Sequence, residues 1–93
     1  MKSVQINSIV IKNKDVIQKE LDGITYLMNP NEMTIHTLNH TASFIWNSFN
    51  KKISMQKLVK ALTKTYAIDE HVAVRDLLEF VRLYVDHGML RII

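Results

Sequence analysis

The chain has 93 residues, of which 47% are hydrophobic and 23% charged, and this composition predicts one folded domain over residues 1–93. The absence of cysteine excludes disulfides, thiolate catalysis and thiolate metal sites, and the two glycines, Gly23 and Gly88, are too far apart for the phosphate-binding loop motifs. No apolar run is long enough to cross a membrane and the first residues do not resemble a signal peptide, so we expect a cytoplasmic protein.

The net charge of +3 is unevenly distributed along the chain. Residues 33–68 contain five lysines and no acidic residue, whereas residues 69–93 contain five acidic residues and three arginines. A basic total charge is typical of proteins that bind nucleic acid, because clustered Lys and Arg neutralise the phosphates. Here the positive excess is confined to the middle of the chain, so the total charge is only weak support for that function.

The first part of the chain has the pattern of β-strands separated by turns. Three strands are predicted, over residues 16–21, 24–28 and 33–38. The pair Asp22-Gly23 favours a two-residue hairpin turn between the first two, and Asn29 to Glu32 form the next turn. Residues 4–12 fit either a short edge strand or an extended arm, and the sequence leaves both open.

From Asn39 onward the apolar residues recur with a helical period. Asn39 is expected to cap a first helix that runs to about residue 50, and Ser54 to cap a second one. Asp69 is expected to cap a third, longer helix that ends at Gly88, and residues 89–93 form an apolar tail. Strands over about 16–38 followed by helices over about 39–88 predict an α+β fold.

The third predicted helix carries more apolar surface than its core stripe needs. At 100° per residue, Leu78 lies on one flank with Arg75 and Arg82, whereas Leu83 lies on the other with Asp76. A groove along one of these flanks would use the extra apolar surface, and the sequence does not choose between the two.

The sequence offers no arrangement that is typical of catalysis or of metal binding. No nucleophile with a base and no paired carboxylates are apparent, so we expect neither enzyme activity nor a cofactor. His36 and His40 are four residues apart, but a strand-to-helix boundary is predicted between them, so no metal site is expected. His87 is interpreted as a cationic partner of the carboxyl end of the third helix.

A series of short motifs runs along nearly the whole chain. In order they are Tyr26-Leu27-Met28-Asn29-Pro30, Leu38-Asn39, Thr41-Ala42, Ile45-Trp46, Ser54 to Leu58, Leu62 with Tyr66 and Ile68-Asp69, Asp76-Leu77, Phe80-Val81 and Gly88-Met89-Leu90. Their order and spacing resemble the PqqD-like family, the RiPP recognition elements, which bind leader peptides of ribosomally made and modified peptides. The sequence departs from the family at residues 50–52, where a turn with Asp-Gly is common, and in the tail beyond Leu90.

The resemblance implies a winged-helix-like fold and a non-catalytic, peptide-binding function. In the family, the leader adds as an extra strand to the third strand, and its side chains enter a pocket between that strand and the third helix. An edge strand suits this use, because its unpaired N–H and C=O groups can bind an extended peptide. The implied peptide-binding residues are Met33, Thr34, Ile35, His36, Thr37 and Leu38 on the strand, with Arg75, Asp76, Leu78, Arg82 and Leu83 on the helix. A groove on the arginine flank would favour acidic leader residues, and one on the aspartate flank basic residues.

The resemblance also implies partners. These are a precursor peptide and a separate modifying enzyme, such as a radical-SAM enzyme, a leader peptidase or a cyclase. Neither a membrane nor nucleic acid is expected as a partner. A second copy of the chain could pair through the same edge and give a homodimer.

The main alternative function is that of a winged-helix DNA-binding transcriptional regulator. The acidic third helix counts against it. Another is a regulatory or scaffolding subunit that binds only its enzyme.

Overall fold

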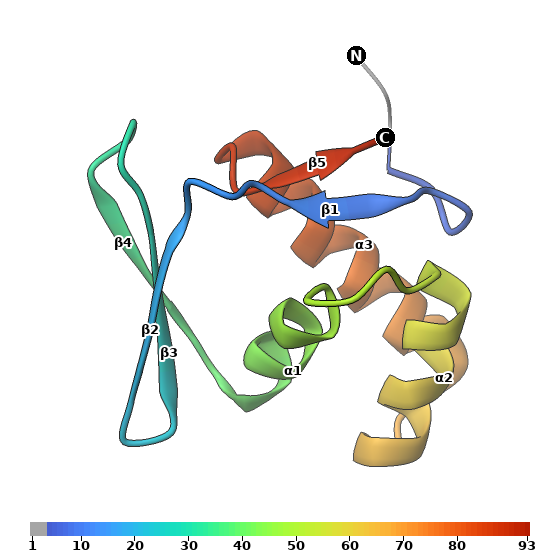
Figure 1. The fold of residues 1–93 in the computed structure, drawn as a ribbon. Helices are drawn as coiled ribbons and strands as arrows, with labels where there is room; N and C mark the ends of the chain where they lie inside the picture. Colours follow the sequence, from blue (N-terminus) through green and yellow to red (C-terminus); the bar gives the residue numbers. More distant parts are fainter. Residues whose placement is uncertain (1–3) are drawn as a thin grey trace.

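The computed structural model describes residues 4–93, which form two small antiparallel sheets and three helices (Figure 1). The elements in chain order are β1 (Val10–Lys12), β2 (Ile17–Leu21), β3 (Ile24–Asn29), β4 (Thr34–Leu38), α1 (His40–Ser48), α2 (Met55–Tyr66), α3 (Glu70–Asp86) and β5 (Leu90–Ile92). The predicted α+β fold is therefore confirmed, with a three-stranded antiparallel sheet followed by three helices. Within this part of the chain, every helix is too short or too polar to span a bilayer.

The three-stranded sheet has the strand order β2-β3-β4, so β2 and β4 are its two edges. Asp22 and Gly23 have φ angles of 52° and 79°, as a type I′ turn requires, and they join β2 to β3 as predicted. Each strand boundary lies within one residue of its predicted position. Met33 is a correction: its φ of 58° places it in the turn before β4, not in the strand.

The second sheet pairs the two ends of the described chain. β1 and β5 are antiparallel, with Val10 opposite Ile92 and Lys12 opposite Leu90. Of the two possibilities that the sequence left open for the first residues, the structure shows a short edge strand at residues 10–12. The prediction of a tail after the third helix is wrong, because Leu90–Ile92 form a strand. Val10 and Leu90 are both buried, so pairing the two strands also places apolar side chains from both ends in the core.

Side-chain capping fixes the starts of two of the three helices. Asn39 Oδ1 accepts a hydrogen bond from the Ala42 N–H at 2.8 Å, and Ser54 Oγ accepts one from the Lys57 N–H at 3.1 Å, as predicted. The Asp69 side chain makes no such bond, so that predicted cap is wrong in detail. Asp69 is exposed at the end of the helix, where water can satisfy the open amides.

The carboxyl end of α3 is held by a tight turn and by the sheet. Gly88 has a φ of 71°, and the following Met89 N–H donates to the Tyr84 carbonyl at 2.8 Å. Asn29 Nδ2, at the end of β3, donates to the His87 carbonyl at 2.8 Å. A side chain at Gly88 would meet this same amide, because its Cβ would lie 2.9 Å from Asn29 Nδ2. The end of α3 is therefore fixed next to the β3–β4 turn.

The hydrophobic core lies between the inner face of the β2-β3-β4 sheet, the β1-β5 sheet and the three helices (Figure 1). Its largest fully buried side chains are Trp46, Leu27, Leu38, Met55, Leu58, Leu62, Leu77, Met89, Leu90 and Val81. Burial of one such apolar side chain contributes about 1.5–3 kcal/mol to the free energy of unfolding. This core fixes α3 behind the sheet and so sets the geometry of the candidate site.

Candidate functional site

The outer edge of β4, called the free edge because no other strand of residues 4–93 pairs with it, is the edge at which the family resemblance implies leader binding. Which residues face that edge follows from the strand register. A two-residue type I′ hairpin closes on a hydrogen-bonded pair, which here is Leu21 opposite Ile24. The backbone groups of successive strand residues point to opposite sides. Every second residue of β3 starting from Ile24 therefore bonds to β2, and the residues between them bond to β4.

The same alternation decides the orientation of each residue in β4. The residues of β3 that bond to β4 lie opposite Thr34, His36 and Leu38. These three residues direct their backbone groups toward β3. Ile35 and Thr37 therefore direct their N–H and C=O groups to the free edge. An extended peptide that adds to β4 would bond to these two residues.

The side chains on the two faces of β4 have different surroundings. Leu38 is buried and His36 is half-buried against the helices, whereas the Ile35 side chain is 69% exposed on the outer face. The His36 ring lies 5.5 Å from the Tyr84 ring and 4.5 Å from the His87 ring, measured between centroids. The carboxyl-terminal part of α3 thus lies directly behind β4.

These contacts also show which flank of α3 is on the side of β4. Leu83 and Asp76 lie within about 40° of His87 around the helix axis. The Arg75, Leu78 and Arg82 flank is about 120° to 180° away from His87. Leu83 is an exposed apolar side chain at 48%, and half-buried Phe80 lies beside Tyr84 with ring centroids 4.6 Å apart. Of the two flanks left open by the sequence, the one with Asp76 and Leu83 is the one turned toward β4.

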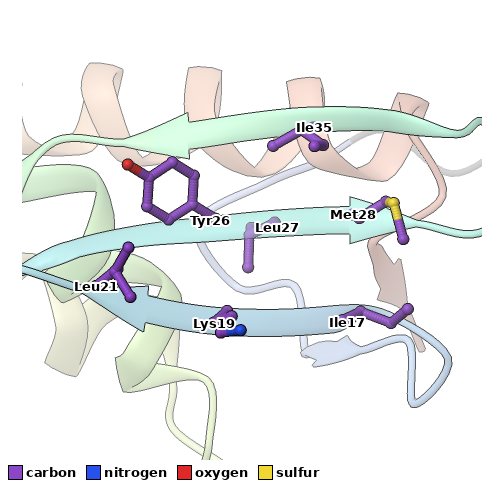
Figure 2. A pocket seen from close by; sticks show the side chains of 7 residues that line it. All are labelled: Ile17, Lys19, Leu21, Tyr26, Leu27, Met28 and Ile35. Atoms are coloured by element: carbon purple, nitrogen blue, oxygen red, sulfur yellow. The ribbon is translucent and has the colours of Figure 1, made fainter.

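The outer face of the β2-β3-β4 sheet is apolar as well. Ile17, Met28 and Ile35 lie opposite one another across the three strands. Together with Leu21 and Tyr26 they line a shallow depression of about 360 Å³, and Figure 2 shows their side chains along this face. A peptide strand added to β4 would continue this surface, because its outward side chains would lie next to Ile35.

The other edge of the sheet, β2, is joined to α1. The Trp46 indole Nε1 donates to Gln18 Oε1 at 2.7 Å, and Gln18 Nε2 donates to Asn47 Oδ1 at 3.3 Å. Lys12 lies over the Trp46 ring at 4.4 Å and donates to the Asn50 side chain. Burial lowers the pKa of Lys12 to about 8, since desolvation disfavours its charged form. These contacts connect β1, β2 and α1 to one another.

The inner side of β4 has a different set of polar groups. Burial raises the pKa of Tyr84, because desolvation disfavours the phenolate. Around His36 and Tyr84, the structure brings together His87 and Glu32, whose side chains form an ion pair at 3.0 Å when His87 is protonated. This grouping was not predicted from the sequence, because His87 at the end of α3 is 55 residues from Glu32, although Glu32 and His36 are close in sequence.

The lysines of the basic middle of the chain lie away from the β4 edge. Lys57, Lys60 and Lys64 are exposed on α2, which packs against α3. The lysines are therefore on a different element from the β4 edge, and they are not part of the candidate site.

Comparison with known proteins identifies the family. The family model described as "Coenzyme PQQ synthesis protein D (PqqD)" matches residues 25–90, and the chain belongs to this family. The fold is similar to that of a solved structure described as "TbiB1 in Complex with the TbiA(beta) Leader Peptide", with a TM-score of 0.81 and 22% identity. That similarity covers 87% of this chain and 94% of the other. No curated protein matches the sequence.

Proposed function

We propose that this protein binds the leader segment of a ribosomally made precursor peptide by strand addition to the free edge of β4. The observation that carries the proposal is the outer edge of β4, which pairs with no other strand among residues 4–93, beside the exposed apolar flank of α3. Membership of the PqqD family and the fold similarity to a protein in complex with a leader peptide support the same function. Main-chain bonds to Ile35 and Thr37 would supply affinity that tolerates sequence variation.

Side-chain contacts on the two faces of the added strand would supply specificity. Inward-facing leader side chains would meet Leu83 and Phe80, and a basic leader residue would be favoured near Asp76. Outward-facing ones would cover Ile35 and extend the apolar outer face. We place Met33, Thr34, Ile35, His36, Thr37 and Leu38 in the site with Asp76 and Leu83, and Arg75, Leu78 and Arg82 outside it.

The protein would act without chemistry of its own. Residues 1–93 would form one binding domain that presents the leader to a separate modifying enzyme, such as a radical-SAM enzyme, a leader peptidase or a cyclase. Holding the precursor on a module that also contacts the enzyme raises the effective concentration of substrate at the enzyme. We place this role in the cytoplasm, where precursor peptides are synthesised. A second copy of the chain would compete with the leader for the same edge.

The test is a binding measurement with a site-specific readout. A fluorescently labelled leader, taken from the precursor encoded beside this gene, is titrated with the protein and compared with a scrambled peptide of the same composition. Amide hydrogen exchange is then followed with and without the leader. We expect preferential binding of the native leader and slower exchange at the Ile35 and Thr37 amides, with the β2 edge unchanged.

Two outcomes would contradict the proposal. Equal affinity for the native and scrambled peptides would show that the protein does not recognise the leader sequence. Slower amide exchange at the β2 edge in place of β4 would show that the leader does not add to β4. A gel-shift series with duplex DNA is run in parallel, and steeply salt-dependent retardation would favour the winged-helix DNA-binding alternative.

A further inference from the structure

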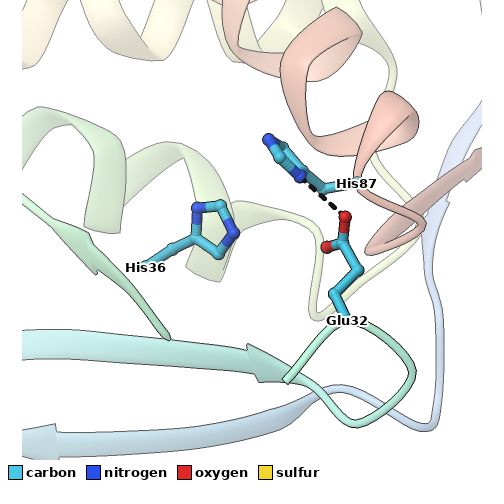
Figure 3. Close-up of side chains that lie close together, drawn as sticks. All are labelled: Glu32, His36 and His87. Carbon is cyan, nitrogen blue, oxygen red and sulfur yellow. Dashed lines mark hydrogen bonds and ion pairs between the residues drawn. The ribbon is translucent and has the colours of Figure 1, made fainter. Parts of the chain in front are cut away.

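Three potential metal ligands meet at the carboxyl end of α3. Glu32 comes from the β3–β4 turn, His36 from β4, and His87 from the end of α3 (Figure 3). One ligand atom from each, a carboxylate oxygen or a ring nitrogen, lies within 4.8 Å of the other two. His87 Nδ1 and Glu32 Oε2 are already 3.0 Å apart.

The His36 ring shows that this grouping lacks a partner. Its Nε2 atom is buried and has no hydrogen-bond partner among residues 4–93. A buried polar atom without a partner has lost its hydrogen bonds to water, so such atoms usually face a bound water or an ion. His36 comes from a strand whose position is fixed by the β3–β4 register, and the neighbouring His87 ring is 4.5 Å away. The unpartnered nitrogen is therefore held beside a second imidazole.

The backbone that carries the ligands is also fixed. Asn29 Nδ2 donates to the His87 carbonyl, and Asn29 Oδ1 accepts from the Asn31 N–H at 3.0 Å. Asn29 thus joins the turn that carries Glu32 to the helix end that carries His87. The residues of a metal site need such support if they are to keep their geometry before the ion binds.

We propose that Glu32, His36 and His87 bind a divalent transition metal ion, with Zn²⁺ as the natural occupant. Two imidazoles and a carboxylate suit Zn²⁺, whereas Mg²⁺ and Ca²⁺ prefer oxygen ligands only. In a tetrahedral site with ligands at about 2.0–2.1 Å, two ligand atoms are about 3.3 Å apart. The exposed Glu32 side chain and small ring rotations can close the remaining separation. The negative end of the α3 dipole and the Glu32 charge both favour a cation here.

Binding would have a structural consequence. The three ligands belong to the turn, to β4 and to the end of α3, so one ion would link the edge strand to the helix behind it. Three protein ligands leave a fourth position for water or for a group of a bound partner. The inference does not depend on the proposed leader binding, because it rests on the positions of these side chains alone.

The experiment uses the full-length, untagged protein after removal of metal by a chelator. Zn²⁺ is titrated by calorimetry in the presence of a competing chelator, and Co²⁺ is titrated by visible absorption, whose intensity reports four-coordination. We expect one ion per chain and a rise of the melting temperature when Zn²⁺ is added. Glu32→Gln and His36→Ala should each weaken Zn²⁺ binding by more than about 10-fold, since the loss of outer-shell partners alone has effects of 10- to 100-fold.

His71→Ala is the matched control, because His71 is an exposed histidine on α3 outside the cluster. It should bind Zn²⁺ as the wild type does. Glu32→Gln changes an exposed turn residue and keeps the fold, so it tests the site even if His36→Ala unfolds the chain. The proposal is overturned if the wild type does not bind Zn²⁺, if Glu32→Gln binds it unchanged, or if His71→Ala loses it.

Discussion

The two edges of the β2-β3-β4 sheet have the same backbone chemistry but different neighbours. The β2 edge carries charged Lys19 and Glu20, and its Gln18 side chain is joined to Trp46 of α1. The β4 edge carries no formal charge from Thr34 to Thr37, and exposed Leu83 is on the side of α3 turned toward it. Charges discourage pairing at an edge, whereas an apolar flank beside it rewards pairing. If the leader binds at β4 as proposed, the neighbours of a sheet edge, and not its own hydrogen-bonding groups, select it for binding.

Proline substitutions should give the largest difference in leader affinity between the two edges. Ile35→Pro removes the N–H that faces the free edge of β4, and it should lower leader affinity by about 5- to 150-fold, the range for a lost hydrogen bond with an unpaired partner. Glu20→Pro is the matched control, because by the same alternation its N–H faces the free edge of β2. Fluorescence anisotropy measures affinity and circular dichroism the fold. Equal losses from both variants would show that the comparison of edges is wrong.

A substitution at the β2 edge should instead change the free energy of unfolding. Gln18→Leu leaves the buried Trp46 indole N–H without its acceptor, so the free energy of unfolding should fall by about 1–3 kcal/mol while leader affinity stays constant. Lys19→Leu changes the outer face of the same strand and should alter stability by less than about 0.5 kcal/mol. Urea denaturation gives both values. A Gln18→Leu protein of wild-type stability that binds leader poorly would reverse the roles of the two edges.

A smaller effect is expected from the helix flank beside β4. Leu83→Ser removes an exposed apolar side chain and should weaken leader binding by about 3- to 10-fold, with little change in melting temperature. Arg82→Ser, about 100° further around the helix, should leave the affinity unchanged. Isothermal titration of the leader into each variant measures the difference. A larger loss from Arg82→Ser than from Leu83→Ser would place the leader on the other flank.

The fold was predictable because each of its signals is local. The Asp22-Gly23 turn, the capping residues Asn39 and Ser54 and the helical period of the apolar residues each depend on neighbours in sequence. The β1-β5 pairing was not predictable, because residues 10–12 and 90–92 are short apolar segments whose partner is set by the core. The position of Met33 in the turn was not predictable either. Its positive φ angle has no sequence signal of the kind that a glycine gives.

The elements that form the candidate site were predictable from local patterns, whereas its use was not. Alternation predicted the strand over residues 33–38 and helical periodicity left Leu83 and Leu78 as extra apolar residues, but the leader-binding edge was implied by the family resemblance alone and stays a prediction. The choice between their flanks required the contact of His36 with His87, and the grouping of Glu32 with these two histidines required the fold. Contacts between residues that are 50 or more positions apart leave no periodic pattern in a single sequence.

The smallest expected effect concerns charge, and it tests the choice of flank most directly. For a leader with a basic residue opposite the helix, Asp76→Asn should lower affinity by less than about 5-fold, because an ion pair exposed to solvent contributes about 0.2–1 kcal/mol. The loss should shrink in high salt, where exposed charges are screened. Arg82→Gln is the control and should have no effect. If Arg82→Gln raises the affinity for this leader and Asp76→Asn leaves it unchanged, the basic leader residue lies beside Arg82, on the flank of Leu78. That flank points away from β4, so strand addition at Ile35 and Thr37 would then be excluded by geometry.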